Sequence, residues 1–326
     1  MPKDTLKLVL FDGNAILHRA YHAFPLTLKT QTGELTNAVY GFTSTLLTVF
    51  KRLRPTHVVV AFDEKGPTFR HQQFEDYKAS RPKMDDELAC QISRTKEVVA
   101  TLNIPQFAIS GFEADDVLGT LARQAEAAGF TEIVIVTGDK DALQLITEKT
   151  HVYFPSRGKK PEKLYDKTQF CQEFGFEPPL LVDFKALAGD SSDEIPGVSG
   201  IGPKTATELI VQHGPVEEIY KQLDKIKLAV AQKLKKDKEM AFLSKKLATI
   251  ETSAPVVFDA KESQLKEYNK EKVIALFEAL EFRSLIRRLP SDSWEEMAEE
   301  VFAEHKEKKL KTGKKSTEND SQMKLF

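Results

Sequence analysis

Three short apolar runs alternate with helical patterns in the first half of the chain, and this alternation constrains the fold more than any other feature. The runs are LKLVLF at 6–11, HVVVAF at 57–62 and IVIV at 133–136, and segments with helical periodicity at 37–53, 85–102 and 115–128 separate them. Strands separated by helices favour a parallel sheet covered by helices on both faces. We therefore expect an α/β fold with a mostly parallel central sheet and a ligand crevice at the carboxyl ends of its strands.

Each of the three apolar runs is followed by aspartate. Asp12 follows the first run, Asp63 the second, and Asp139 and Asp141 come shortly after the third. Parallel strands bring their carboxyl ends to one edge of a sheet, so these side chains are expected to lie together. A single aspartate at a strand end is commonly a turn or cap residue, but three in three runs indicate a shared site.

Further acidic clusters follow the same logic. Glu113, Asp115 and Asp116 lie in four consecutive residues just before an apolar helical pattern. One or two acids would suit the positive end of a helix dipole, whereas three repel one another and call for a cation. Asp190 and Asp193 form another pair at the end of a helical pattern.

Nine carboxylates together predict a site for hard divalent cations. Magnesium is the natural choice and manganese can substitute, since oxygen ligands suit these ions and neighbouring His or Cys ligands for zinc are lacking in the sequence pattern. Two ions roughly 4 Å apart are the usual arrangement for phosphodiester hydrolysis. The candidate metal-binding residues are Asp12, Asp63, Glu113, Asp115, Asp116, Asp139, Asp141, Asp190 and Asp193.

A glycine-rich turn between two helical patterns predicts a helix–hairpin–helix that holds a DNA backbone without reading bases. Gly197, Gly200 and Gly202 would let a phosphate approach, and Lys204 and Thr205 begin the following helix. Downstream, residues 221–246 contain nine lysines against three acids. This segment is either a phosphate-tracking surface or an ordinary solvated helix face.

The stretch 69–82 places cations and aromatic residues at helical spacing on one face: Arg70, Phe74, Tyr77, Lys78 and Arg81. Such a face suits frayed or single-stranded ends, where bases stack and phosphates pair with cations. The alternative is an amphipathic helix that buries Phe74 and Tyr77. Lys78 and Arg81 are the residues we expect at the reacting phosphate.

Composition sets broad limits. The 326 residues are 41% hydrophobic and 29% charged, with a formal net charge of −2. This charge argues against a uniformly basic nucleic-acid coat but allows acids and lysines to gather at separate places. Cys90 and Cys171 have no metal or redox spacing, and no apolar run reaches membrane-spanning length. Both thiols are therefore expected to be reduced, as in a cytosolic protein.

With these motifs assembled, the chain resembles the 5′-nuclease domain of bacterial DNA polymerase I, in the flap endonuclease superfamily. The resemblance covers about residues 5 to 290. The matching stretches are FDGN at 11–14, RAYHAF at 19–24, FD at 62–63, TFR at 68–70, YKASRP at 77–82, EADD at 113–116, TGDKD at 137–141, GDSSD at 189–193 and the hairpin at 197–205.

The resemblance implies a PIN-like nuclease fold and a structure-selective 5′–3′ exonuclease or 5′-flap endonuclease acting on flaps, nicks and RNA primers in replication and repair. It maps all nine acids onto the metal site and Lys78 and Arg81 onto the scissile phosphate, with Tyr77 beside the substrate. Arg19 and Arg70 are expected at the DNA, and a potassium ion at the hairpin. Glu194 is a departure, because the family usually has asparagine there.

Three regions are expected. Residues 1–175 would form the metal-binding nuclease domain, including a helical arch at about 66–100, and residues 176–290 the helical DNA-binding region. Residues 291–326 would hold an extra helix, with Ser293 and Glu296 as a capping box, and a disordered tail. The tail ends in a sequence similar to clamp-binding peptides, with Gln322, Leu325 and Phe326 as anchors, which suggests a stand-alone nuclease that docks on the sliding clamp.

Two other functions remain open at this point. A non-catalytic DNA-junction binder could keep the fold and the hairpin. A metal-dependent ribonuclease could use a similar sheet but would not need the clamp at 197–205.

Overall fold

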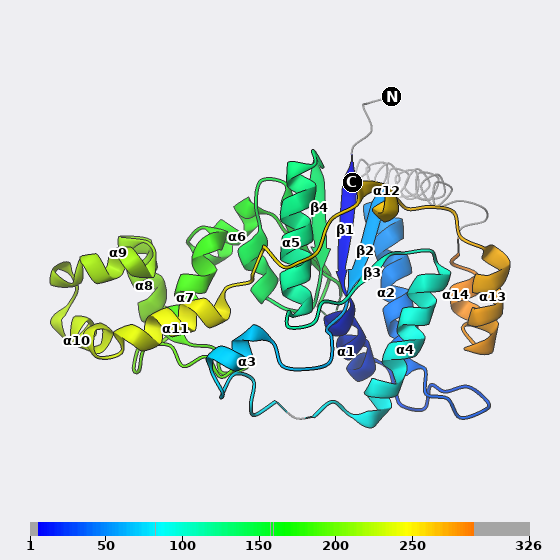
Figure 1. The fold of residues 1–326 in the computed structure, drawn as a ribbon, viewed down its shortest axis with the longest axis horizontal. Coiled ribbons are helices and arrows are strands. Elements are labelled where there is room, and N and C mark those ends of the chain that lie inside the picture. The colour runs from blue at the N-terminus through cyan, green and yellow to red at the C-terminus, as the bar shows by residue number, and fades with distance from the viewer. Residues whose placement is uncertain (1–5, 82, 157, 159, 290–326) are drawn as a thin grey trace, which may run out of the picture.

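The computed structural model describes residues 6–81, 83–156, 158 and 160–289. A six-stranded sheet in the order β3-β2-β1-β4-β5-β6 lies at its centre (Figure 1). Neighbouring strands are parallel except for β6, which is antiparallel to β5. The mostly parallel α/β architecture predicted from the sequence is confirmed. The strands are β1 (Lys7–Asp12), β2 (His57–Ala61), β3 (Gln106–Phe107), β4 (Glu132–Val136), β5 (Thr150–Phe154) and β6 (Lys163–Tyr165).

β1 is the central strand because it pairs with both β2 and β4. Phe11 lies opposite Val60 of β2 and Val136 of β4. The near-continuous apolar sequence of β1 is typical of a parallel strand that is covered on both faces, and residues 8–12 are all buried. This register places Asp12 beside the carboxyl ends of the two neighbouring strands.

Side chains alternate between two cores, one on each face of the sheet. Leu8 and Leu10 pack into the core that includes α5, whereas Val9 and Phe11 pack into the core that includes α1 and α2. The helices of the second core are α1 (Gly13–Ala23), α2 (Asn37–Leu53), α4 (Asp86–Thr101), α13 (Lys270–Ala279) and α14 (Arg283–Ile286). The first core contains α5 (Ala114–Ala127), the 3₁₀ turn η1 (Asp141–Leu145) and α6 (Lys167–Phe174).

A helical region follows the sheet and extends away from it on one side (Figure 1). Its core is continuous with the sheet, because Ile210 and Ile219 belong to the same buried cluster as Leu118 of α5. The two parts therefore stabilise each other. The elements are η2 (Pro178–Leu180), α7 (Leu181–Ala188), α8 (Pro203–His213), α9 (Val216–Lys221), η3 (Leu223–Lys225), α10 (Leu228–Lys236) and α11 (Lys238–Ala248).

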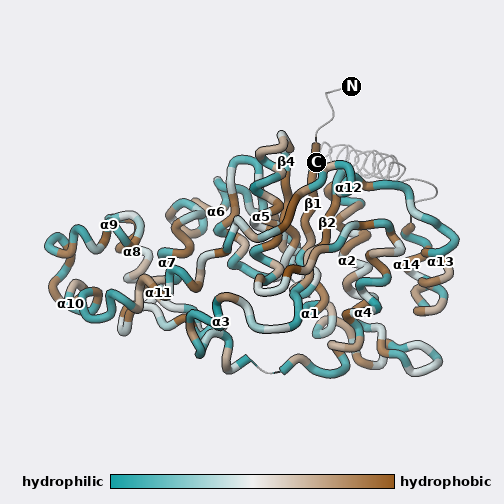
Figure 2. The backbone as a smooth tube through the Cα atoms, in the orientation of Figure 1, coloured by the Kyte–Doolittle hydropathy of each residue, from teal (hydrophilic) through white to brown (hydrophobic). Residues whose placement is uncertain are grey.

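After α11 the chain returns across α5 to the sheet, where apolar residues are concentrated (Figure 2). The side chain of Gln124 fixes this return, donating to the carbonyl of Val256 at 2.8 Å and accepting from the amide of Phe258 at 2.7 Å. The Leu265 amide then donates to the carbonyl of Thr56 at the sheet edge, at 2.9 Å. The short helix α12 (Ala260–Ser263) lies within this segment.

The predicted helical run through residues 69–81 is wrong. The helix α3 (Phe69–Gln73) is short, and residues 74–81 form turns. Lys78 has a φ of 55°, which a right-handed helix excludes. A tertiary contact holds this conformation, because the Lys78 amide donates to the carbonyl of Asp193 at 3.2 Å. Within the region 66–100, the described residues between α3 and α4, 74–81 and 83–85, are thus not helical.

Among the described residues no helix combines the length and the apolar character needed to cross a membrane. Residues 290–326 lie outside the described part of the chain. The predicted capping box at Ser293 and Glu296 and the predicted clamp-binding residues Gln322, Leu325 and Phe326 fall there.

Candidate metal centre and nucleic-acid interface

The carboxyl edge of the sheet gathers aspartates from three strands. Asp12 ends β1 and caps α1, accepting from the Ala15 amide at 2.8 Å and from the Thr137 hydroxyl at 2.7 Å. Asp63 follows β2 and accepts from the amide of Ala114, the first residue of α5, at 2.8 Å. Strand order and helix starts together therefore hold these carboxylates at one place.

The pKa values of two of these residues show that their surroundings disfavour the ionised carboxylates. Burial, and then the charges of Asp63 and Asp139, raise the pKa of Asp12 to about 7. Burial and the charge of Asp12 raise the pKa of Asp115 well above its usual range. Because burial and neighbouring like charges both disfavour ionised carboxylates, this group favours the binding of protons or metal cations.

A second group of carboxylates is already neutralised by basic side chains. Lys78 lies 2.9 Å from Glu113 and 3.8 Å from Asp193, and Arg81 lies 2.7 Å from Asp193. Lys185 of α7 contacts both Asp141 and Asp190.

Lys185 shifts the acidity of its partners. Burial alone would raise the pKa of Asp190, but hydrogen bonds from Lys185 and Ser192 outweigh it and hold this pKa at about 2. Burial and the charge of Asp139 raise the pKa of Asp141 to about 6 despite Lys185. Ligand oxygens of Asp141, Asp190 and Asp193 lie within 4.8 Å of one another.

The donor set fits hard divalent cations. The acidic groups that converge here offer carboxylate oxygens, which magnesium and manganese prefer, and burial and neighbouring acids raise the pKa of Asp12 and Asp115 in the first group. Asp12, Asp63, Asp115 and Asp139 would hold one ion. Asp141, Asp190 and Asp193 offer oxygens close enough for another.

The structure corrects the predictions for Asp116 and Arg70, because these two buried side chains form an ion pair with each other. The guanidinium of Arg70 donates to both carboxylate oxygens of Asp116, at 2.8 and 2.7 Å. The amides of Glu113 and Glu251 donate to the same carboxylate. Asp116 is 0% exposed and Arg70 is 3% exposed. In this structure Asp116 therefore ties α5 to α3 in place of binding metal, and Arg70 does not reach DNA.

Tyr77 is also placed differently from the expectation of an aromatic surface for bases. Its ring is 2% exposed and packs in a small core with Ile195 and Leu247. Its hydroxyl donates to Glu113 at 3.2 Å. In this conformation the hydroxyl of Tyr77 orients the carboxylate of Glu113. Its buried ring offers no face on which a base could stack.

The glycine-rich turn forms the predicted connection between α7 and α8. Gly197 has a φ of 64°, and a Cβ there would lie 2.3 Å from the Gly189 nitrogen, so only glycine fits. Gly202 caps α8, and the space where its Cβ would stand is open. Lys204 is exposed and Thr205 half-buried in the first turn, and Gly200 accepts from Lys233 at 2.8 Å.

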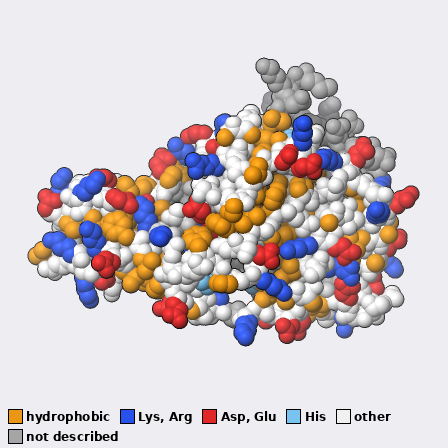
Figure 3. Space-filling view, viewed as in Figure 1, with side chains coloured by type: hydrophobic (Ala, Val, Ile, Leu, Met, Phe, Trp, Pro, Cys, Tyr) orange, Lys and Arg blue, Asp and Glu red, His pale blue; other side chains and the backbone are white. Residues whose placement is uncertain are grey.

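The lysine-rich stretch 221–246 lies mainly at the surface. Eight of its nine lysines are exposed, and Lys245 is half-buried. Basic and acidic side chains alternate over the α8–α11 end of the molecule (Figure 3). This pattern leaves both interpretations of the stretch open.

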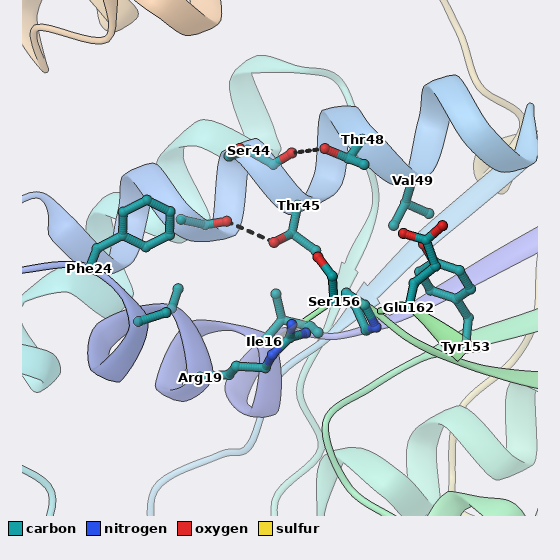
Figure 4. Close-up of a pocket in the computed structure, with 14 residues that line it drawn as sticks. Ile16, Arg19, Phe24, Ser44, Thr45, Thr48, Val49, Tyr153, Ser156 and Glu162 are labelled. Atoms are coloured by element: carbon teal, nitrogen blue, oxygen red, sulfur yellow. Dashed lines mark hydrogen bonds between the residues drawn. The ribbon is translucent and has the colours of Figure 1, made fainter. Parts of the chain in front are cut away.

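Arg19 lines a cavity of about 180 Å³ between α1, α2 and the segment after β5 (Figure 4). Hydroxyl groups of Ser44, Thr45 and Ser156 line the same cavity. On its other side Arg19 approaches Gly138, in the loop that carries Asp139. Arg19 thus lies near the predicted metal centre without belonging to it.

Glu194 stands at a position that suits asparagine better. Its φ is 52°, in the left-handed region that asparagine tolerates. One of its carboxylate oxygens, Oε2, is buried and has no hydrogen-bond partner among the described residues. The departure noted in the sequence is therefore a site of local strain.

Sequence reasoning missed three contributors to this edge. Lys185 was overlooked because it lies within the apolar helix pattern of α7. Its spacing of five residues before Asp190 is the signal that could have found it. Asn14 accepts from the Asp63 amide at 3.1 Å, and Thr137 positions Asp12; both belong to motifs that the sequence already singles out.

Family models cover most of the chain. One described as 5′–3′ exonuclease, N-terminal resolvase-like domain, matches residues 7–175. A second described as 5′–3′ exonuclease, C-terminal SAM fold, matches residues 176–271.

Curated relatives include DNA polymerase I of Caldicellulosiruptor bescii, which is 43% identical over 286 residues, covering 87% of this chain and 33% of that protein. DNA polymerase I of Bacillus subtilis is 41% identical over 290 residues, covering 89% of this chain and 33% of that protein. The chain thus spans about a third of the length of these relatives.

Solved structures share the fold. The T5 D15 protein, co-crystallised with metal ions, has a TM-score of 0.64 at 20% identity and covers 84% of this chain and 99% of its own. The catalytic core of Rad2 in complex with DNA substrate has a TM-score of 0.53 at 13% identity, covering 88% and 93%. The models, the relatives and the sheet with its helical region show together that the chain belongs to the 5′–3′ exonuclease family of nuclease enzymes.

Proposed function

We propose that this protein hydrolyses phosphodiester bonds at the 5′ ends of DNA strands, with 5′ flaps, nicks and RNA primers as substrates in replication and repair. One observation carries the proposal: β1, β2, β4 and the start of α5 bring Asp12, Asp63, Asp139 and Asp115 to one edge of the sheet, where burial and then repulsion between the carboxylates raise the pKa of Asp12 and Asp115. Bound cations would neutralise the unfavourable concentration of negative charge in this cluster.

Two Mg²⁺ ions, for which Mn²⁺ can substitute, would supply Lewis acidity that activates a water and neutralises the leaving oxygen. The chain's own residues fix where this happens. Thr137 and the Ala15 amide orient the carboxylate of Asp12, and the Ala114 amide orients that of Asp63. These side chains are thus held in place before any substrate arrives.

Lys78 and Arg81 form a basic wall beside Glu113 and Asp193. Burial alone would lower the pKa of Lys78, but the charge of Glu113 raises it above its ordinary value, so the ammonium stays protonated. The Arg81 side chain is 50% exposed and pairs with Asp193 at 2.7 Å, so a phosphate could reach its guanidinium from the solvent side. Both would stabilise negative charge that grows on the reacting phosphate.

The turn between α7 and α8 would hold the duplex away from the reacting bond. Gly202 leaves open space before the first turn of α8, where unpaired amides and the positive end of the helix dipole attract a phosphate. A potassium ion between the turn carbonyls and a phosphate would add to this contact.

Two further points rest on the sequence. The residues Gln322, Leu325 and Phe326 would dock on the sliding clamp, so that a chain truncated after residue 321 should bind the clamp more weakly and cleave flaps at an unchanged intrinsic rate. We place the protein in the bacterial cytoplasm, on nucleoid DNA, and expect it to act as a monomer.

The deciding experiment compares wild type, Asp63→Ala and Asp139→Ala on a labelled 5′ flap, with and without Mg²⁺. Both variants should lose cleavage and keep flap binding. Undiminished Mg²⁺-dependent cleavage by the purified variants would falsify the proposal. Binding of flaps by the wild type without turnover would indicate a junction-binding protein, and preference for single-stranded RNA over flap and blunt duplex DNA would indicate a ribonuclease.

A further inference from the structure

The predicted metal centre contains two kinds of carboxylate. No described basic side chain forms an ion pair with Asp12 or Asp115, although the charge of Lys78 acts on Asp115, and burial is the largest cause of their raised pKa values. Asp141 and Asp190 instead share one basic side chain, that of Lys185. The two ends of the centre therefore present different charge to an incoming cation.

Lys185 is built into the protein interior. It lies on α7, and its side chain is only 10% exposed. Neighbouring residues of α7, among them Ala186 and Leu187, pack in the core that joins the helical region to the sheet. The backbone position of Lys185 is therefore fixed. Its side chain extends from the protein interior to Asp141 and Asp190.

The ammonium stands where a metal ion would be expected. It contacts Oδ1 of Asp141 and lies 2.5 Å from Oδ2 of Asp190. Together with Asp193, these two residues form a group of carboxylates whose oxygens lie within 4.8 Å of one another. An ammonium and a divalent cation cannot both occupy the middle of this group, because they compete for the same oxygens and repel each other.

We propose that Lys185 is a positioning residue that serves as an internal cation: it holds Asp141 and Asp190 together in the metal-free protein, and the second divalent ion has to displace it. This inference rests on the two-ion centre proposed above. It predicts unequal ion affinities. The first ion enters the group around Asp12 and Asp115 and relieves repulsion, whereas the second ion must break two ion pairs before it binds.

Removing the ammonium tests this directly. Mn²⁺ binding to the full chain without DNA is measured by electron paramagnetic resonance for wild type and Lys185→Met. The methionine keeps an unbranched chain of similar length but carries no charge. The affinity of the weaker ion should rise at least tenfold, which corresponds to about 1.4 kcal/mol, and the affinity of the tighter ion should change much less.

The chain offers a matched control in Lys245 of α11. Lys245 also bridges two carboxylates, Asp183 at 2.6 Å and Glu217 at 2.7 Å, but neither is among the predicted metal ligands. Lys245→Met should lose two ion pairs and leave both Mn²⁺ affinities unchanged. Lys185→Arg, which keeps the charge, should keep a weak second ion.

The outcomes separate the inference from the function on which it rests. Equal or weaker binding of the second ion by Lys185→Met, with wild-type circular dichroism, would overturn the inference alone and would show that Lys185 only orders the carboxylates. If Lys185→Met does not fold, Lys185→Gln gives a second neutral variant with the same expected result. A wild-type chain that binds no Mn²⁺ would overturn the two-ion centre and this inference together.

Discussion

Arg70 of α3 donates two hydrogen bonds, of 2.8 and 2.7 Å, to the buried carboxylate of Asp116. The same guanidinium donates to the carbonyls of Leu247 and Thr249 at the end of α11. One side chain thus joins the first turn of α5, the segment that leads to Lys78 and the start of the returning chain. A pair this buried is retained for position more than for net stability.

Arg70→Met is expected to destabilise the protein by about 3–5 kcal/mol, because it leaves a fully buried carboxylate without its cation. Urea unfolding followed by circular dichroism measures the change. The double variant Arg70→Met/Asp116→Met should recover much of the loss, since it removes both charges. A double variant as unstable as the single one would contradict this explanation.

Arg81→Ala should leave stability within about 0.5 kcal/mol, because its ion pair with Asp193 is half exposed to solvent. Flap cleavage should fall by about 10²–10³-fold if Arg81 stabilises charge on the reacting phosphate. Single-turnover rates on a labelled flap give the result. Wild-type rates would show that the basic wall consists of Lys78 without Arg81.

Glu194→Asn should stabilise the protein by about 1 kcal/mol, since asparagine tolerates the left-handed backbone and would not bury a carboxylate oxygen without a partner. Urea midpoints measure the gain. Glu281 is the control: its φ is 60°, but its carboxylate accepts from the Gln31 amide at 2.7 Å. Glu281→Asn therefore trades a hydrogen bond for relief of strain and should gain less. An equal gain at both positions would rule out the buried oxygen as a cause.

Two glycine substitutions should separate folding from DNA binding. Gly197→Ala should cost about 3 kcal/mol, because its Cβ would overlap the Gly189 backbone at a positive φ. Gly202→Ala meets open space and should keep wild-type stability. Its Cβ would instead crowd the phosphate before α8, so flap affinity in a fluorescence-anisotropy titration should fall several-fold. Unchanged affinity would place the DNA backbone elsewhere.

Asp115→Asn should raise the melting temperature of the metal-free protein at pH 8, since it removes one of several buried like charges. The same variant should show a smaller rise in melting temperature on addition of Mg²⁺, because it has lost a ligand. Thermal unfolding with EDTA and with Mg²⁺ measures both effects. Equal stabilisation by Mg²⁺ of variant and wild type would exclude Asp115 as a ligand.

The sheet, and the edge at which its strand-terminal aspartates gather, could be predicted because they follow from periodicity along the chain. The runs that contain β1, β2 and β4 are mostly apolar, and α2 occupies the residues 37–53 that its pattern predicts. β5 is not among the predicted strands, because threonine and histidine interrupt the apolar pattern of THVYF. The short β3 and β6 are not predicted either. With two and three residues, they are too short for any period to show.

The errors arose where distant contacts override local pattern. Arg70 and Tyr77 have the spacing of an exposed helix face, yet α11 and α5 cover them. Lys78 adopts a positive φ without a glycine to signal it, because Asp193, far along the chain, accepts its amide hydrogen bond. Such effects depend on the assembled fold, and no window of sequence contains them.

The central place of β1 in the sheet has a consequence for biosynthesis. β1 leaves the ribosome before both of its neighbours in the sheet. β4 follows only after β2, α4 and α5, and Asp190 and Asp193 come later still. No early fragment can contain the complete set of acids, and parallel pairing over such separations is slow. A nascent chain without the helical region therefore lacks Asp190 and Asp193, and the proposed metal centre becomes complete only when that region has joined the sheet.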